Sequence, residues 1–172
     1  MTEKKEAKFL KYDDLLDIPK QQIQEHYAVY EGQIKKFNGM PTSDKEKMSV
    51  LNSIKLHEGY FDNIGGTGRA GGHIIDLLER GFGSVDDWER EFRELAAEAD
   101  EWLVLAYDME DNKLRHVLCS DSEALWNCVA LLVFCAHEHA YSKMDKSAYI
   151  EAFIKNIDWE YVNTLLGKFG IR

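Results

Sequence analysis

Two stretches of the sequence each carry an apolar stripe at helical spacing, and each stripe has a histidine in its middle. The first stripe, between Pro19 and about Phe37, consists of Ile23, His26, Tyr30, Ile34 and Phe37. The second stripe consists of Val50, Ile54, His57, Phe61 and Ile64. The short connection at Gly39 and Pro41 favours an antiparallel helical hairpin, so the two imidazoles could meet across it. An unpaired imidazole is costly to bury, and for either histidine alone a hydrogen bond is the simplest remedy.

After the two stripes, the spacing of apolar residues changes from that of helices to that of strands and then returns to that of helices. This order of elements predicts an α+β fold. A capping box of Ser43 and Glu46 starts the second helix, and Ser84 caps a later one. The further helices are predicted at residues 72–80, 85–97, 139–144, 147–156 and 159–169. Residues 102–107 and 113–118 predict a hairpin, and the apolar run at 128–134 predicts a buried third strand. We expect a single domain over residues 1–172, with an N-terminal helical hairpin segment at about 1–66. A segment with a three-stranded antiparallel sheet and surrounding helices follows at about 67–172.

Glycines are dense between Gly65 and Gly72, which predicts a flexible connector between the two segments. No strand precedes these glycines, and neither the Lys-Ser/Thr ending of a phosphate-binding loop nor the dinucleotide spacing is present. A plain turn is therefore the better interpretation than a nucleotide site.

The net charge of −10 is spread along the chain, which opposes nucleic-acid binding because phosphate contacts need clustered Lys and Arg. No apolar run approaches the roughly 20 residues that cross a bilayer. The polar first residues lack the apolar core of a signal peptide, so we expect a cytoplasmic protein without a membrane partner. The absence of an export signal argues against a disulfide framework, so Cys119 and Cys128 are expected to be reduced thiols, and Cys135 is a separate case.

Residues 135–139, Cys-Ala-His-Glu-His, place thiol and imidazole groups close together at the end of the buried third strand. Both groups are common transition-metal ligands, although the pentapeptide alone is only suggestive. Combined with the two histidines on core faces, it predicts that His26, His57, Cys135 and His139 bind one metal ion.

Over nearly its whole length the sequence resembles the iron/manganese superoxide dismutases. The shared segments are Phe82-Gly-Ser84, Trp102-Leu-Val104, Glu138-His-Ala-Tyr141 and Asn156-Ile-Asp-Trp159-Glu-Tyr-Val162. The resemblance implies that the first helix supplies His26 as a ligand and the second supplies His57. An aromatic pair, Tyr60 and Phe61, and Asn63 follow His57, as the family pattern requires. It also implies that His139 is the last ligand.

The segment that supplies the last two ligands departs from the family pattern. The family has Asp-X-Trp-Glu-His-Ala-Tyr, where this chain has Cys135-Ala136-His137-Glu138-His139-Ala140-Tyr141. Cys135 thus replaces the carboxylate ligand, and His137 replaces the tryptophan.

The surroundings of the expected metal also differ from those implied by the resemblance. Ile34 occupies the position of the family's gateway tyrosine, and Tyr30 occupies that of a family histidine. Asp100 occupies the position of a tryptophan that lines the family's active-site cavity. Ser53 and Ser122 occupy the two places from which a glutamine can hydrogen-bond the metal-bound solvent. The inherited activity is superoxide dismutation, which we expect to be weak or altered. His137 is a candidate replacement proton donor because an imidazole suits proton transfer near neutral pH.

The family implies one Fe or Mn ion per subunit. A thiolate with three imidazoles is a softer ligand set that favours Zn or Fe(II), and zinc cannot support dismutation because it has no redox chemistry. One alternative is therefore a non-dismutase protein with a zinc or structural metal site. Another is a thiol-based redox protein, or one that resembles superoxide reductases in ligand type.

The resemblance also implies a homodimer that acts on superoxide. In the family, the glutamate before the last ligand pairs with that same histidine in the other subunit, and an interface tyrosine follows. Glu138, His139 and Tyr141 match this pattern. A carboxylate that orients a ligand imidazole from across a two-fold axis would couple metal binding to assembly.

Overall fold

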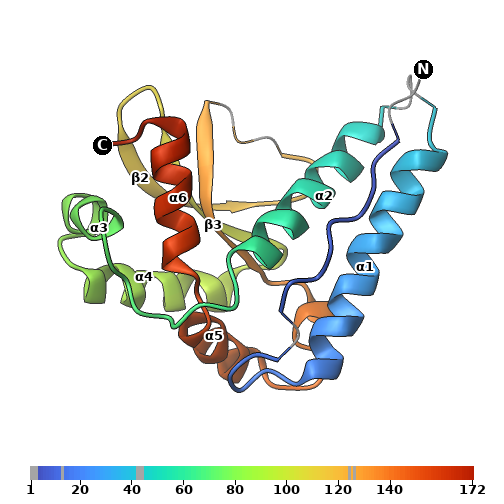
Figure 1. The fold of residues 1–172 in the computed structure, drawn as a ribbon, viewed down its shortest axis with the longest axis horizontal. Helices are drawn as coiled ribbons and strands as arrows, with labels where there is room; N and C mark the ends of the chain where they lie inside the picture. The colour runs from blue at the N-terminus through green and yellow to red at the C-terminus, as the bar shows by residue number, and fades with distance from the viewer. Residues whose placement is uncertain (1–3, 13, 42–44, 124, 126) are drawn as a thin grey trace.

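The computed structural model describes residues 4–12, 14–41, 45–123, 125 and 127–172. Its helices are α1 (Lys20–Gly39), α2 (Lys47–Asp62), α3 (Ile74–Phe82), α4 (Val85–Glu98), α5 (Lys146–Lys155) and α6 (Trp159–Phe169). Its strands are β1 (Trp102–Asp108), β2 (Lys113–Cys119) and β3 (Cys128–Cys135), and a short 3-10 helix, η1, spans Glu138–Ala140. This is the predicted α+β arrangement (Figure 1).

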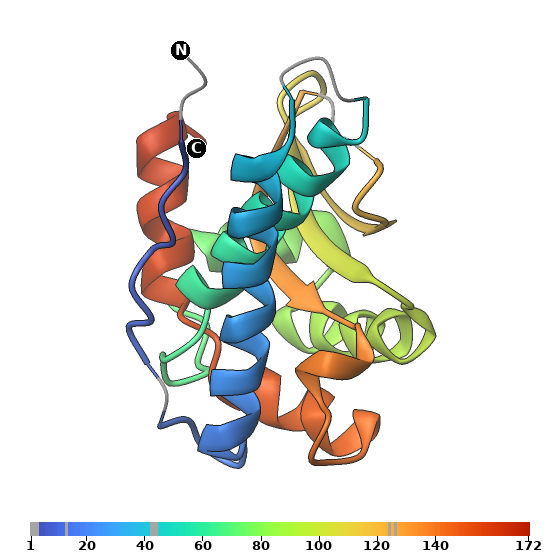
Figure 2. The ribbon, with the colours of Figure 1, turned by 90° about the vertical axis from the view of Figure 1, so that its right-hand side faces the viewer.

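The first two helices form the predicted antiparallel hairpin, in which α1 packs on α2 and α2 packs on β3 (Figure 1). The stripes explain this arrangement, because the buried residues of α1 include Ile23, His26 and Ile34 and those of α2 include Ile54 and His57. Ser43 of the predicted capping box lies outside the described residues. Figure 2 shows α1 in front, with the chain that follows β3 beside its lower half, where η1 contacts α1.

The sheet is antiparallel with strand order β2-β1-β3, so β1 is central. Trp102 at the start of β1 lies opposite Cys119 at the end of β2 and Cys135 at the end of β3. The segments that leave these three strand ends therefore meet at one end of the sheet. The pairing of β1 with β3 shifts between Leu105 and Ala106, where Leu131 is the extra residue on β3.

The remaining helices cover the sheet: α3 contacts β2, α6 contacts β3, and α4 packs against α3 and α5. The predicted cap of α4 is confirmed, since the backbone N–H of Asp87 donates to Ser84 Oγ at 2.9 Å. The predicted helix at residues 139–144 is wrong, because only the turn η1 forms there. The Lys143 backbone N–H donates instead to the Gln22 side chain of α1 at 3.0 Å, so it is not available to a continued helix.

The glycine-rich connector is a turn packed against the junction of α5 and α6. The amides of Gly65 and Gly66 both donate to Asn156 O, at 2.9 and 3.0 Å. Gly68 has a φ of 70°, and a Cβ atom there would lie 2.6 Å from Ile154 O. Glycine is thus required for close approach of two backbones, which supports the interpretation as a turn.

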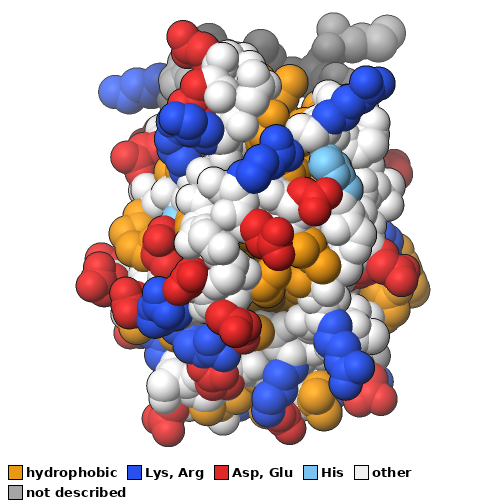
Figure 3. All heavy atoms as spheres, turned by 90° about the vertical axis from the view of Figure 1, so that its left-hand side faces the viewer, with side chains coloured by type: hydrophobic (Ala, Val, Ile, Leu, Met, Phe, Trp, Pro, Cys, Tyr) orange, Lys and Arg blue, Asp and Glu red, His pale blue; other side chains and the backbone are white. Residues whose placement is uncertain are grey.

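None of the described helices is both long and apolar enough to cross a bilayer. On the face shown in Figure 3, Lys and Arg side chains lie among Asp and Glu side chains. That distribution does not offer the clustered positive charge that a phosphate backbone requires.

Candidate metal centre

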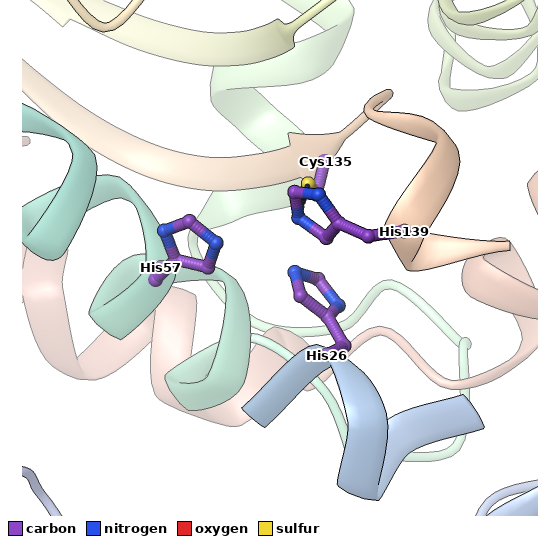
Figure 4. A group of neighbouring side chains, drawn as sticks. All are labelled: His26, His57, Cys135 and His139. Carbon is purple, nitrogen blue, oxygen red and sulfur yellow. Dashed lines mark hydrogen bonds between the residues drawn. The ribbon is translucent and has the colours of Figure 1, made fainter. Parts of the chain in front are cut away.

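The four predicted ligands lie together, although they come from four elements (Figure 4). His26 extends from the middle of α1, His57 from α2, Cys135 from the last position of β3, and His139 from η1. One possible ligand atom from each lies within 4.8 Å of the others. His26 and Cys135 are 0% exposed and His57 is 1% exposed, so the cluster lies inside the core.

Three ring nitrogens in this cluster are buried without a hydrogen-bond partner among the described residues: both nitrogens of His26 and Nε2 of His57. The other nitrogen of His57, Nδ1, lies 2.8 Å from Ser53 O. Donation of the Nδ1–H to this carbonyl leaves the Nε2 lone pair free for the cluster. Burial lowers the pKa of His57 to about 4 and holds the pKa of His26 well below its usual value. Both rings are therefore neutral near pH 7, as metal ligands must be.

Cys135 and His139 are spaced as two ligands of one ion would be. Cys135 Sγ lies 3.7 Å from His139 Nε2. Sulfur and nitrogen atoms that share a tetrahedral zinc ion at its usual bond lengths lie about 3.6 Å apart. Burial lowers the pKa of His139 to about 4, so this ring is also neutral.

The Cys135 thiol needs a nearby cation in order to ionise. Burial raises its pKa well above the usual range, and only the hydrogen bond from the backbone N–H of His137 opposes this. A buried thiol in this state is unreactive, which argues against a free redox-active Cys135. A bound cation would stabilise the thiolate. The unpartnered nitrogens and the buried sulfur together fit one transition-metal ion.

Aromatic rings line the cluster and keep water away from it. The ring centroids of Tyr60 and His26 lie 4.6 Å apart, and those of Trp102 and His57 lie 4.9 Å apart. Tyr149 Oη lies 3.1 Å from Cys135 O and 3.2 Å from Tyr60 Oη, and both tyrosines are 0% exposed. The cluster therefore lies in surroundings of low polarity, where charges interact strongly.

The polar groups that the family would place beside the metal are absent at the corresponding positions. Ile34 is buried with Val50 and Ile54 in a small apolar cluster. Ser53 Oγ lies 3.5 Å from His57 Nδ1, whereas Ser122 is exposed and its Oγ lies 2.8 Å from Ser120 Oγ.

Two further site residues expected from the sequence lie beside the cluster. Glu138 is exposed, and Tyr141 is half-buried with its ring stacked on that of Tyr149 at 5.7 Å. His139 directs Nε2 at Cys135, so its Nδ1 is left for a different partner.

His137 does not belong to the four-residue cluster, although its ring stacks on that of His139 at a centroid distance of 5.0 Å. It forms a second group with Glu101 and Asp121, in which one possible ligand atom of each lies within 4.8 Å of the others. The two carboxylates were not among the residues predicted from the sequence. A signal for them exists in the sequence, because Glu101 precedes and Asp121 follows the predicted hairpin. Antiparallel pairing brings the start of its first strand beside the end of its second.

Comparison with known proteins identifies the family. Residues 70–165 match the family described as iron/manganese superoxide dismutases, C-terminal domain. The chain is 34% identical over 128 residues to the superoxide dismutase [Fe] of Cupriavidus metallidurans, a match that covers 70% of this chain and 64% of that protein. It is 30% identical over 112 residues to superoxide dismutase [Mn] 1 of Halobacterium salinarum, covering 61% of this chain and 56% of that protein. The chain thus spans less than two thirds of the length of these relatives. Since the family profile covers more than half of the chain, this protein belongs to the iron/manganese superoxide dismutase family.

Proposed function

We propose that this protein is a single-domain member of its family that binds one metal ion per subunit through His26, His57, Cys135 and His139. Its inherited activity is superoxide dismutation, in a weakened or altered form. The observation that carries the proposal is the cluster itself, in which three buried ring nitrogens have no hydrogen-bond partner in the described part of the chain and lie beside a buried sulfur. Family membership supplies the class of chemistry, since the matched relatives are superoxide dismutases of the iron and manganese types.

When bound, iron or manganese supplies the one-electron exchange with superoxide that dismutation requires. The protein residues hold the ion and shape its surroundings. Ser53 O fixes the ring of His57, and the His137 backbone N–H supports a thiolate at Cys135. Tyr60 and Trp102 exclude water from two sides of the cluster.

Proton supply is the step for which this chain is poorly equipped. Dismutation converts two superoxide ions and two protons into O₂ and H₂O₂, so a donor must stand within hydrogen-bond reach. Ile34 offers no polar atom, and the Tyr30 hydroxyl is occupied because it donates to Glu58 at 3.0 Å and accepts from the Lys8 backbone at 2.9 Å. We include His137 in the proposal as the proton donor, since its ring stacks on that of His139.

The test combines metal analysis with a direct superoxide-consumption assay on the protein purified from its own source. We expect about one equivalent of metal at the centre and turnover far below that of a matched relative such as the Cupriavidus metallidurans enzyme. Cys135→Ser should reduce metal retention, while Cys128→Ser, at a half-buried position at the other end of β3, should not. Cys135→Asp should shift metal preference towards Fe or Mn without restoring much activity, because Ile34, Ser53 and Ser122 still occupy the positions of the family's polar groups beside the metal.

Two outcomes would contradict this proposal. Equal metal content in the Cys135→Ser and Cys128→Ser variants would show that Cys135 is not a ligand. Turnover as fast as that of the relatives would show that the protein has an efficient proton supply, and His137→Phe would then reveal whether His137 provides it.

A non-redox zinc protein is the second candidate, and the burial of the cluster favours it. Structural zinc sites are closed, four-coordinate and built from Cys and His. Here three of the four residues are at most 1% exposed. Native protein that contains zinc and shows no superoxide consumption would establish this alternative and exclude a dismutase role.

A further inference from the structure

We propose that Glu101, Asp121 and His137 form a second cation site, separate from the four-residue centre, that takes a divalent transition-metal ion such as Zn²⁺ or Mn²⁺. The three residues come from three loops that meet at one end of the sheet. Glu101 immediately precedes β1, Asp121 follows β2, and His137 follows β3. One carboxylate oxygen from each acid and one imidazole nitrogen lie within 4.8 Å of one another.

Hydrogen bonds hold these loops in place and still leave ligand atoms free. The Ala136 N–H donates to Glu101 O at 2.8 Å, which ties the end of β3 to the start of β1. The Asp121 N–H donates to Glu101 Oε2 at 3.0 Å, and the Trp102 indole donates to Asp121 Oδ1 at 2.8 Å. Each carboxylate therefore uses one oxygen to fix its own position and keeps a second for a ligand. A site whose side chains are already fixed loses little entropy when an ion binds.

This corner of the protein has negative charge without a positive partner. Among the described residues, no Lys or Arg pairs with Glu101 or Asp121. The same negative charge acts on the nearby Cys119 thiol. Burial raises the pKa of Cys119 to about 11, and repulsion from Glu123, Asp121 and Glu101 contributes to this rise. The described residues also give the His137 ring nitrogens no hydrogen-bond partner, although the ring is fixed against Trp102 at 5.4 Å and His139 at 5.0 Å. A divalent cation would balance the charge and use the free nitrogen.

The ligand set indicates the kind of ion. Two carboxylates and one imidazole are harder than the Cys and His set of the first centre and suit Zn²⁺ or Mn²⁺. Mg²⁺ and Ca²⁺ prefer oxygen ligands throughout, so the imidazole selects against them. A cation here would also occupy the ring that we propose as a proton donor, so the two roles of His137 exclude each other in any one molecule.

The test is the number of Zn²⁺ or Mn²⁺ equivalents that metal-free protein binds, measured by titration calorimetry and by metal analysis after gel filtration. We expect two equivalents for the unmodified chain and one for Glu101→Gln, Asp121→Asn and His137→Phe, with at least a tenfold loss of affinity at the second site. Glu101→Gln is the mildest change, and near-ultraviolet circular dichroism will check that each variant is folded. The matched controls are Asp100→Asn and Glu123→Gln, exposed acids next to the site that are not in the cluster.

A His139→Ala variant separates this proposal from the proposed function. If the unmodified chain binds one equivalent that Glu101→Gln removes and His139→Ala retains, the second site stands and the four-residue centre fails. If it binds one equivalent that only His139→Ala removes, the second site is refuted. A second equivalent that Glu123→Gln weakens as much as Glu101→Gln would mean general attraction to acidic surface, which also refutes the site.

Discussion

His116 is a buried histidine of a different kind from those of the candidate metal centre, because a carboxylate contacts it. Its side chain is 1% exposed, and its ring packs on that of Phe82 at a centroid distance of 4.8 Å. Nδ1 lies 2.9 Å from Glu91 Oε1, whereas Nε2 is buried with no hydrogen-bond partner among the described residues. Burial lowers the pKa of His116, and the contact with Glu91 offsets this only in part.

This histidine should make the folded protein sensitive to acid. The unfolded chain, with an ordinary histidine pKa of about 6.5, takes up a proton at a higher pH than the folded chain does. The free energy of unfolding should therefore fall as the pH drops below about 6.5, by at most about 1.4 kcal/mol per pH unit for this one group. Urea unfolding at pH 7, 6 and 5 should show a shallower fall for His116→Phe than for the unmodified chain. Identical slopes would contradict this, and the more exposed His73→Gln is the control.

At the scale of elements, Asn63 joins the hairpin to the sheet. It follows α2 directly and is 1% exposed. Its Nδ2 donates to Leu131 O at 2.9 Å, and its Oδ1 accepts from the Val133 N–H at 2.9 Å. Because β3 is an edge strand, these backbone groups face away from β1, and the amide of Asn63 replaces a neighbouring strand. Leu131 is also the extra residue at the register shift.

Replacing Asn63 should therefore loosen the contact between α2 and β3, which carry His57 and Cys135. Asn63→Ala leaves a buried N–H and a buried C=O unpaired, so we expect a loss of about 2–4 kcal/mol in the free energy of unfolding. Asn52→Ala, on the same helix but with none of these contacts, should change it far less. Denaturant unfolding of the metal-free variants measures both. A similar small loss in the two variants would mean that water satisfies the freed groups.

The elements that sequence predicted correctly are those whose signal is local. Apolar stripes predicted α1 and α2, and Ser84 predicted the start of α4, because spacing and capping depend on neighbouring residues. The helix predicted at residues 139–144 does not form, because the backbone N–H of Lys143 donates instead to the side chain of Gln22, which is distant in sequence. The grouping of His26, His57, Cys135 and His139 could be predicted because a histidine on an apolar face is conspicuous in sequence. Glu101 and Asp121 were missed although they flank the predicted hairpin, since polar residues in loops are common and only the strand register brings these two together.

For the whole molecule, the dimer implied by the family is a proposal that the single chain supports through Glu138. This side chain is exposed beside His139, whose Nδ1 is directed away from Cys135. A carboxylate from a partner subunit that reaches this nitrogen would fix the ring and raise its strength as a ligand.

Glu138→Ala should therefore weaken assembly and metal binding together. Light scattering after gel filtration should show a shift from dimer towards monomer, and metal content should fall in parallel. Glu110→Ala, in the exposed turn between β1 and β2, is the matched control and should change neither. A Glu138→Ala protein that remains dimeric with full metal content would contradict the proposed role of Glu138.

The origin of the four proposed ligands in four separate elements has a consequence for how the protein would acquire a metal during synthesis. The hairpin emerges from the ribosome before the sheet and offers two imidazoles, but Cys135 and His139 follow only at the end of β3 and in η1. A complete ligand set would therefore exist only once the sheet has formed against α2. The ion would be selected late, by the folded chain, so the metals available in the cell at that moment would determine which one the protein carries.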